Sequence, residues 1–175
     1  MDRVKRDILI AKADIDKRVQ ELADVISRDY EGKELVVIGI LKGAFVFMAD
    51  LIRSLRVPCM IDFVRLASYG TGTVSSGSIM ITKDIETPIR GRDVLVVEDI
   101  VDTGLSIDFI KRLVALHNPK SFEVVTLLYK KESIRIPTPI KYIGFNIPSD
   151  FVIGYGLDYA QKVRNLPAVY HMIKH

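Results

Sequence analysis

The chain has 175 residues, of which 49% are hydrophobic and 27% are charged, a composition typical of one folded globular domain. The formal net charge is only +3 and the basic residues are scattered among acids, which excludes the basic stripe of a nucleic-acid-binding protein. Cys59 is the single cysteine, which excludes an intramolecular disulfide and a thiolate zinc site. No apolar run reaches the length of a membrane span, and residues 1–10 contain no signal-peptide core. We therefore expect a cytoplasmic protein with one domain over residues 1–175.

The first part of the chain predicts a helix and then a strand–helix–strand unit. Apolar residues recur at helical spacing over residues 15–26, and again over residues 45–55. Between them, residues 35–40 form a continuous apolar run, which is typical of a strand buried on both faces of a parallel sheet. Residues 61–66 alternate between polar and apolar and predict the next strand.

A glycine-rich segment follows this unit. Residues 68–77 contain three glycines and many small hydroxyl side chains, which predicts a mobile loop. Tyr69 is an isolated large side chain at its base, which favours a functional loop over a simple connector. A strand is expected at residues 79–82.

The second part of the chain predicts another strand–helix–strand unit. Short apolar segments at residues 94–97, 122–129 and 142–147 indicate strands, and a helical stripe covers residues 107–117. Alternating strands and helices predict an α/β fold with an open, mostly parallel sheet flanked by helices. Ligands of such sheets bind beyond the carboxyl ends of the strands.

One such strand end combines carboxylates with a phosphate-binding pattern. The strand at 94–97 is expected to end at Glu98 and Asp99, and Asp102 follows after a short apolar step. Residues 103–106, Thr-Gly-Leu-Ser, then lead into a helix N-terminus, which provides unpaired N–H groups and hydroxyl donors for a phosphate. Carboxylates beside a phosphate need a cation or sugar hydroxyls as partners. A ribose phosphate with Mg²⁺ supplies both.

Other interpretations of this stretch explain less of it. A helix N-cap needs one polar residue, whereas residues 98–106 contain five polar residues in nine. The glycine fingerprint of dinucleotide-binding folds and the Walker A pattern of P-loop kinases are both missing. A phospho-acceptor signalling domain also groups aspartates at strand ends, but it does not explain the phosphate-binding residues that follow them.

The sequence of residues 96–106, VVEDIVDTGLS, resembles the PRPP-binding motif of purine phosphoribosyltransferases, where PRPP is 5-phosphoribosyl 1-diphosphate. Further segments resemble the hypoxanthine or hypoxanthine-guanine branch of that family: residues 41–43, 68–70, 150–159 and 164–167. The similarity runs from about residue 9 to residue 167. It implies a type I phosphoribosyltransferase fold, with a core at about 33–140 and a small hood lobe from about 1–15 and 141–175. It also implies a glycosyltransferase of purine salvage that forms IMP, and GMP from guanine.

The resemblance also implies roles for the PRPP-binding motif. Glu98 and Asp99 would hold the ribose hydroxyls, with Mg²⁺ nearby, and Asp102 would be the catalytic acid/base at purine N7. The 5-phosphate would be bound by the loop residues Thr103, Gly104, Leu105 and Ser106. Ser106 stands where the family commonly has threonine, and the hydroxyl is retained.

Residues outside that motif receive roles in the same way. Lys42, Gly43 and Arg164 would contact pyrophosphate, and the Leu41–Lys42 peptide would be cis. Lys130 would donate to purine O6, while Phe151 would stack on the base and Val152 would pair with its edge. Asp158 would lie in the base-binding lobe and serve a second Mg²⁺. Ser68 and Tyr69 would begin the mobile catalytic loop.

Several alternatives stay open at this point. Taken alone, Lys130 fits a solvated lysine at a strand end, Phe151 a core residue, and Arg164 an exposed helix residue. The enzyme could prefer guanine or xanthine. A regulator that keeps the fold as a PRPP sensor would need a basic module for nucleic acid, and none is visible. We expect PRPP and a 6-oxopurine as partners, no nucleic acid or membrane, and a homodimer or homotetramer.

Overall fold

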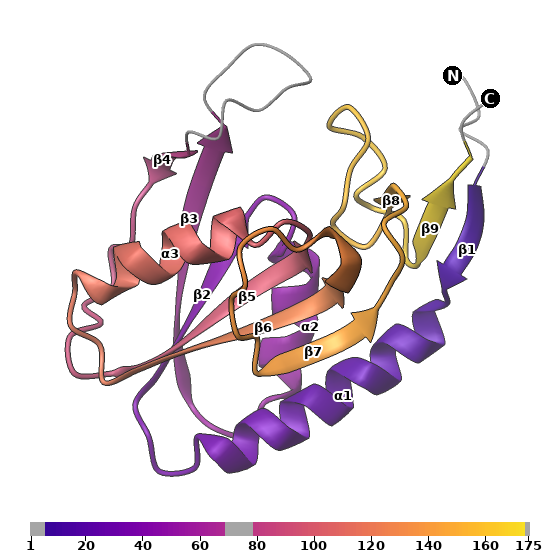
Figure 1. Ribbon diagram of the computed structural model, residues 1–175. Coiled ribbons are helices and arrows are strands. Elements are labelled where there is room, and N and C mark those ends of the chain that lie inside the picture. Colours follow the sequence, from indigo (N-terminus) through magenta and orange to yellow (C-terminus); the bar gives the residue numbers. More distant parts are fainter. Residues whose placement is uncertain (1–5, 69–78, 174–175) are drawn as a thin grey trace.

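The computed structural model describes residues 6–68 and 79–173, and its largest element is a six-stranded sheet with the order β4-β3-β2-β5-β6-β7 (Figure 1). Neighbouring strands are parallel except for β3 and β4, which are antiparallel. The predicted open, mostly parallel sheet is therefore confirmed. Its strands are β2 (Leu35–Leu41), β3 (Cys59–Ser68), β4 (Ile79–Lys83), β5 (Asp93–Val101), β6 (Ser121–Tyr129) and β7 (Tyr142–Asn146).

Helices cover both faces of this sheet. They are α1 (Lys12–Asp29), α2 (Phe45–Ser54) and α3 (Leu105–Ala115), and a short 3-10 turn spans Lys131–Ser133. Successive residues of a strand point to opposite faces, so Val37 packs with α1 and α2, whereas Ile38 packs with α3. This explains why β2 is apolar along its length instead of alternating.

The connections of the sheet run in two directions. The unit β2–α2–β3 extends the sheet toward one edge, and the unit β5–α3–β6 extends it toward the other edge. The carboxyl ends of β2 and β5 therefore lie at a topological switch point. The loops diverge there, which leaves a crevice for a ligand.

Strand β5 is longer than the sequence indicates. The prediction that it ends before Glu98 is wrong, because β5 continues to Val101 beside β6, with Glu98 opposite Thr126. Pairing with β6 extends the strand through the two carboxylates. Glu98 and Asp99 are consequently buried, at 8% and 7% exposure.

The two ends of the described chain form a second, small sheet; it lies in the terminal segments from which the resemblance implied a hood lobe, but its strands were not predicted. It contains β1 (Arg6–Ile10), β9 (Val169–Met172) and β8 (Val152–Ile153) in the order β1-β9-β8, and both pairings are antiparallel. The first and last described strands therefore lie side by side (Figure 1). Among the helices of the described residues, none is long and apolar enough to cross a membrane.

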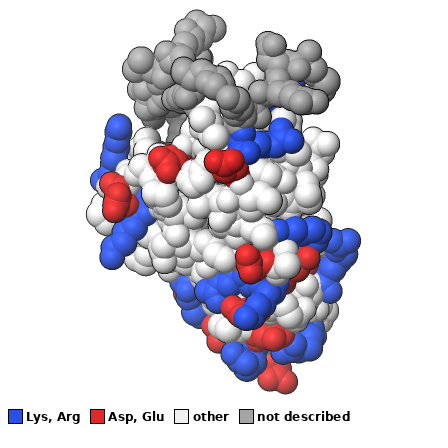
Figure 2. All heavy atoms as spheres, turned by 90° about the vertical axis from the view of Figure 1, so that its right-hand side faces the viewer, with Lys and Arg blue, Asp and Glu red and all other residues white. Residues whose placement is uncertain are grey.

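The surface on the side of β1 and β9 carries both signs of charge. Figure 2 shows basic and acidic side chains interspersed there, around a broad uncharged area. Mixed signs produce no extended positive field.

Candidate active site

A cavity of about 360 Å³ opens at the switch point between β2 and β5. The strand ends and the C-terminal segment line it together, although they are distant in sequence. Residues singled out from the sequence that line it are Lys42, Gly43, Asp99, Asp102, Lys130, Phe151, Val152, Asp158 and Arg164. Glu98 and the loop residues 103–106 are neighbours of Asp99 and Asp102 in the sequence, but they do not line the cavity.

The loop after β2 forms one side of the cavity. The Leu41–Lys42 peptide is cis, which confirms that expectation. Gly43 packs directly against Asp99, because a Cβ on Gly43 would overlap the Asp99 carboxylate. Only glycine allows the loop to approach β5 so closely.

The carboxyl group of Asp99 lies against this loop, and Glu98 precedes it in β5. Burial raises the pKa of Glu98 well above its ordinary value, and the nearby Asp99 raises it further. Burial also raises the pKa of Asp99. Glu98 Oε2 is buried and has no hydrogen-bond partner among the described residues. An unpaired buried oxygen of this kind is suited to a cation or a hydroxyl donor.

The turn between β5 and α3 is where the sequence predicts an anion site. Gly104 takes a φ of +86° before the first residue of α3, a conformation that favours glycine. The Thr103 carbonyl accepts hydrogen bonds from the N–H groups of Arg135 and Ile136, at 3.0 and 3.1 Å, so a second segment holds the turn in place. The N–H groups in the first turn of α3 have no partner within the helix and favour an anion.

Lys130 is buried at the end of β6, with 7% exposure. Its N–H donates to the Val101 carbonyl at 3.0 Å, which fixes it beside the end of β5. Its Nζ lies 3.4 Å from Asp102 Oδ2. Lysine is rarely buried unless it is paired, so the alternative of a solvated lysine does not hold.

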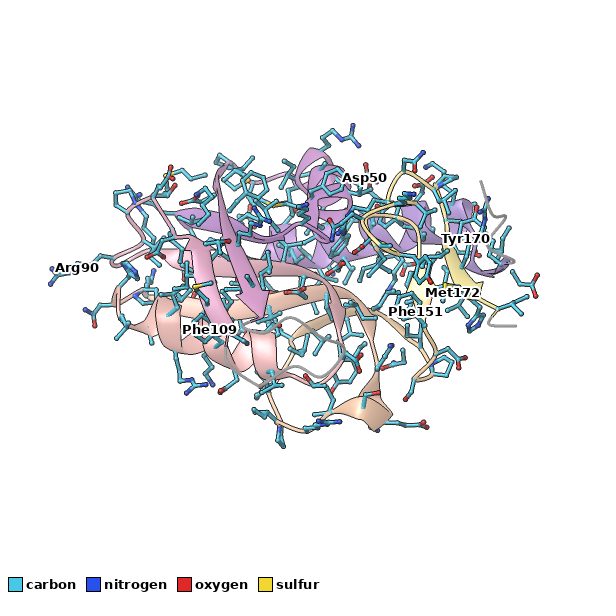
Figure 3. All side chains as sticks on the ribbon, turned by 90° about the horizontal axis from the view of Figure 1, so that it is seen from above. Asp50, Arg90, Phe109, Phe151, Tyr170 and Met172 are labelled. Carbon is cyan, nitrogen blue, oxygen red and sulfur yellow. The ribbon has the colours of Figure 1, made fainter. Side chains whose placement is uncertain are left out.

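The C-terminal segment forms the remaining wall. Phe151 is 45% exposed, and its ring meets the ring of Tyr159 edge to face at 6.2 Å between centroids. Figure 3 places Phe151 near Met172 of β9, whose N–H donates to the Phe151 carbonyl at 3.1 Å. The alternative of a core phenylalanine does not hold, because the ring is half exposed at a cavity.

Arg164 is held in a fixed orientation in the same segment. Its Nη1 donates to the Gly156 carbonyl at 2.8 Å, and its Nη2 lies 2.6 Å from Asp158 Oδ1. Its side chain is 19% exposed. Arg164 is therefore not a free surface residue, and its charge lies at the cavity beside Lys42.

The predicted metal ligands are not gathered into one set. Within residues 6–68 and 79–173, the His, Cys, Asp and Glu side chains form no group of three or more that could hold a metal ion. Asp158 is bonded to Arg164, apart from the pair Glu98 and Asp99. Of the predicted mobile loop, Ser68 ends β3, and Tyr69 lies outside the described residues.

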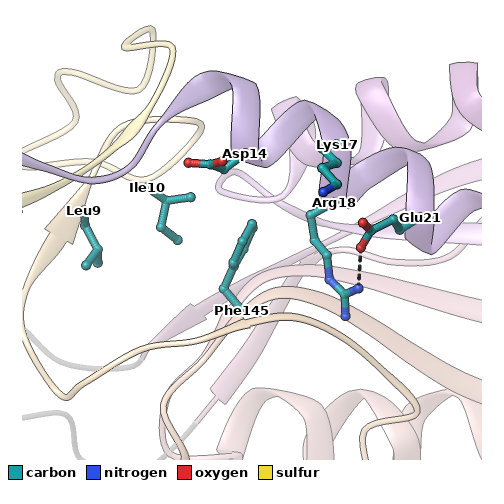
Figure 4. Close-up of a pocket in the computed structure, with 7 residues that line it drawn as sticks. All are labelled: Leu9, Ile10, Asp14, Lys17, Arg18, Glu21 and Phe145. Carbon is teal, nitrogen blue, oxygen red and sulfur yellow. Dashed lines mark hydrogen bonds and ion pairs between the residues drawn. The ribbon is translucent and has the colours of Figure 1, made fainter.

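A second cavity, of about 370 Å³, lies between β1, α1 and β7 (Figure 4). Leu9, Ile10 and Phe145 form its apolar side, and the ion pair of Arg18 with Glu21 forms part of its charged rim. Arg18 also donates to the carbonyls of Gly144 and Ile143, at 2.9 and 2.8 Å, so it joins α1 to β7. This cavity lacks the strand-end carboxylates and the phosphate turn of the first.

Known proteins share this architecture. Residues 7–160 match the model of the phosphoribosyl transferase domain. The chain belongs to the phosphoribosyltransferase family. It is 46% identical over 168 residues to a hypoxanthine-guanine phosphoribosyltransferase of Dictyostelium discoideum, a match that covers 94% of this chain and 93% of that protein.

Two further relatives of this phosphoribosyltransferase agree with that assignment. A hypoxanthine phosphoribosyltransferase of Salmonella typhimurium is 42% identical over 165 residues, with 93% of both chains covered. A crystal structure of a hypoxanthine-guanine phosphoribosyltransferase from Bacillus anthracis superposes with a TM-score of 0.90, at 43% identity and 98% coverage of both chains. The type I phosphoribosyltransferase fold expected from the sequence is thereby confirmed.

Three residues of the phosphoribosyltransferase site were missed by the sequence reasoning. Ile100 and Leu157 line the cavity, but apolar residues at these positions resemble ordinary core residues. Gln161 bonds to Lys42 and Arg164, and a lone polar residue in an irregular segment gives no signal of such contacts. The spacing of Asp158, Gln161 and Arg164, three residues apart each time, was the one available indication.

Proposed function

We propose that this enzyme transfers the 5-phosphoribosyl group of PRPP to N9 of hypoxanthine, and of guanine, and releases pyrophosphate. The products are IMP and GMP, which makes this a reaction of purine salvage. The observation that carries the choice of base is the buried Lys130 ammonium at the cavity. An ammonium offers only donors, and an oxygen at purine C6 is an acceptor.

The base is bound between Lys130 and the C-terminal segment. Lys130 donates to O6, the half-exposed Phe151 ring stacks on the purine, and the backbone of Val152 pairs with its edge. The edge-to-face contact of Phe151 with Tyr159 supports a fixed ring orientation. Adenine would turn an amino donor toward the Lys130 ammonium and leave both groups unpaired, which disfavours it strongly.

The ribose phosphate is bound at the end of β5. Residues 103–106 bind the 5-phosphate through N–H groups and hydroxyls at the start of α3, as the left-handed Gly104 turn supports. Glu98 and Asp99 hold the ribose hydroxyls. Lys42, Gly43 and Arg164 bind the pyrophosphate on the opposite side of the cavity.

The carboxylate side chains at the end of β5 fit Mg²⁺. Carboxylate oxygens are the ligands that this ion prefers, and it combines one or two of them with substrate phosphates and water. Glu98 and Asp99 would hold it on the ribose side, which the unpaired Glu98 Oε2 supports. Asp158 would serve a second ion on the pyrophosphate side. Mg²⁺ would supply positive charge to the leaving pyrophosphate.

Asp102 carries the proton transfer. It accepts the N7 proton of the base while N9 bonds to C1 of the ribose and pyrophosphate leaves. Its carboxylate is half exposed at the cavity and lies 3.4 Å from the Lys130 ammonium. Lys42 and Arg164 stabilise the charge that develops on pyrophosphate. Closure of a loop that begins at Ser68 and Tyr69, a homo-oligomeric state and a cytoplasmic location stay predictions.

The test is pyrophosphate release from PRPP and Mg²⁺ with hypoxanthine, guanine, xanthine and adenine in turn. Hypoxanthine and guanine should react, and kcat/KM for adenine should be lower by about 10⁴-fold or more. Mass spectrometry should identify IMP and GMP as the products. Turnover of adenine at the hypoxanthine rate would contradict the proposed base, and no turnover with any base would contradict the proposed reaction.

A further inference from the structure

A tight turn at the rim of the active site has an unusual backbone. Tyr159 and Lys162 exchange two backbone hydrogen bonds, of 3.1 and 3.0 Å, around the central residues Ala160 and Gln161. Both central residues have positive φ, +49° and +65°. These are the features of a type I′ turn, which favours Asn-Gly because other side chains are strained there. Strain at such a position calls for a reason outside the turn.

The Gln161 side chain supplies that reason. Its Oε1 accepts hydrogen bonds from Lys42 Nζ at 3.0 Å and from Arg164 Nη2 at 3.3 Å. Lysine and arginine only donate, so the amide must turn its oxygen toward them. The two lone pairs of one oxygen thus serve two cations that come from different segments, the loop after β2 and the C-terminal segment.

The backbone of the same residue completes the arrangement. The Gln161 N–H donates to Asp158 Oδ2 at 2.8 Å, and Asp158 Oδ1 pairs with Arg164 Nη2 at 2.6 Å. Gln161 is exposed and does not line the cavity, whereas Lys42 and Arg164 do. It therefore acts on the cavity through these two cations.

We propose that Gln161 is a positioning residue that holds Lys42 and Arg164 together for the pyrophosphate group of PRPP. This inference rests on the proposed function and adds a residue to it. Two like charges repel each other, and a free lysine side chain loses much entropy when a ligand orders it. One shared acceptor keeps the two cations close before the ligand arrives. Because the amide is neutral, it leaves their positive charge available to a polyanion.

The first test replaces the acceptor and keeps the length of the side chain. Gln161→Met should raise the Kd for pyrophosphate with Mg²⁺, measured by calorimetry, about 10-fold, as expected for losing hydrogen bonds to charged groups. KM for PRPP should rise in parallel, while KM for hypoxanthine and the Tm stay unchanged. The matched control is Gln20→Met, since the Gln20 side chain donates to Asp24 on the surface of α1 and its loss should change nothing. Unchanged pyrophosphate affinity in Gln161→Met would overturn the proposal.

The second test separates positioning from a purely structural role. Gln161→Gly relieves the positive φ, so the Tm should rise or hold while pyrophosphate affinity falls about 10-fold. A structural role for the turn predicts that affinity holds together with the Tm, and that result would overturn the proposal. Pyrophosphate binding needs no purine. A wild-type protein that binds pyrophosphate but does not use hypoxanthine would contradict the proposed base alone, and the two variants would still decide the role of Gln161.

Discussion

The two walls of the active site are built in different ways. The wall at the end of β5 consists of a strand inside a parallel sheet and the helix that follows it, and its carboxylates are fixed by backbone pairing with β6. The C-terminal wall, residues 150–168, contains only the short strand β8 and several turns. Its backbone takes positive φ at Gly154, Tyr155, Gly156, Ala160, Gln161 and Val163.

This difference makes the β5 wall the more rigid of the two and the C-terminal wall the more adaptable. The β5 wall cannot shift without breaking the sheet, so it suits groups that must stay in place during bond making and proton transfer. The C-terminal wall depends on individual bonds, such as the one from Tyr155 Oη to Asp50 Oδ2 at 2.6 Å. We infer that the β5 wall carries the chemistry, and that the C-terminal wall, together with Lys130 and Lys42, carries recognition of the base and pyrophosphate.

Among these tests, removal of Mg²⁺ should have the largest effect on turnover. Excess chelator should lower turnover at least about 100-fold, because a metal supplies several kcal/mol of charge stabilisation. Added Mg²⁺ should restore the rate. Full activity in excess chelator would mean that the Glu98 and Asp99 pair serves another purpose.

Asp102→Asn tests the chemistry of the β5 wall. The amide cannot accept the N7 proton, so kcat should fall by about 10² to 10⁴-fold while KM for both substrates changes little. Asp108→Asn on α3 is the matched control. Asp108 pairs with Arg112 at the surface, so its loss should leave kcat unchanged. A large rise in KM with an unchanged kcat would show that Asp102 binds the substrate rather than transferring a proton.

Phe151→Leu tests recognition by the C-terminal wall. Loss of the aromatic face should raise KM for hypoxanthine about 5-fold, since aromatic contacts contribute about 1 kcal/mol beyond buried area. KM for PRPP should stay the same. Phe109→Leu, on α3 and away from Phe151 (Figure 3), serves as the control and should leave both constants unchanged. Equal changes in KM for hypoxanthine and PRPP would indicate that Phe151 does not serve recognition of the base alone.

Tyr155→Phe should have the smallest effect and tests how the C-terminal wall is attached. The variant loses only the bond to Asp50, so the free energy of unfolding should fall by about 1 kcal/mol in urea titration. Hydrogen exchange should speed up in residues 150–168 more than in β5. Uniform acceleration across both walls would show that they open as one unit.

Much of the β5 wall was predictable because its signals are local. The apolar run, the carboxylates and the Thr-Gly-Leu-Ser turn follow one another within a few residues, and the helix comes directly after them. The continuation of β5 through Glu98 was missed, since it depends on pairing with β6 rather than on the residues themselves. The burial of Lys130 was not visible for the same reason.

The C-terminal wall and the small sheet gave weaker signals. β1 pairs with β9 across nearly the whole chain, with Arg6 opposite Met172, and such pairing leaves no periodic pattern in either short strand. The positive φ values at Ala160 and Gln161 could not be anticipated either, because neither residue favours that conformation. Resemblance to a family, rather than propensity, indicated Phe151, Asp158 and Arg164.

The most direct test of the central claim is the kcat/KM for hypoxanthine in Lys130→Met, compared with Lys131→Met. The two lysines are adjacent, but Lys130 is buried at the cavity and Lys131 is exposed. A buried site that loses its donor to O6 should lose about 100-fold or more in kcat/KM, whereas Lys131→Met should match the wild type. An unchanged hypoxanthine rate in Lys130→Met would contradict the assignment of Lys130 as the residue that selects a 6-oxopurine.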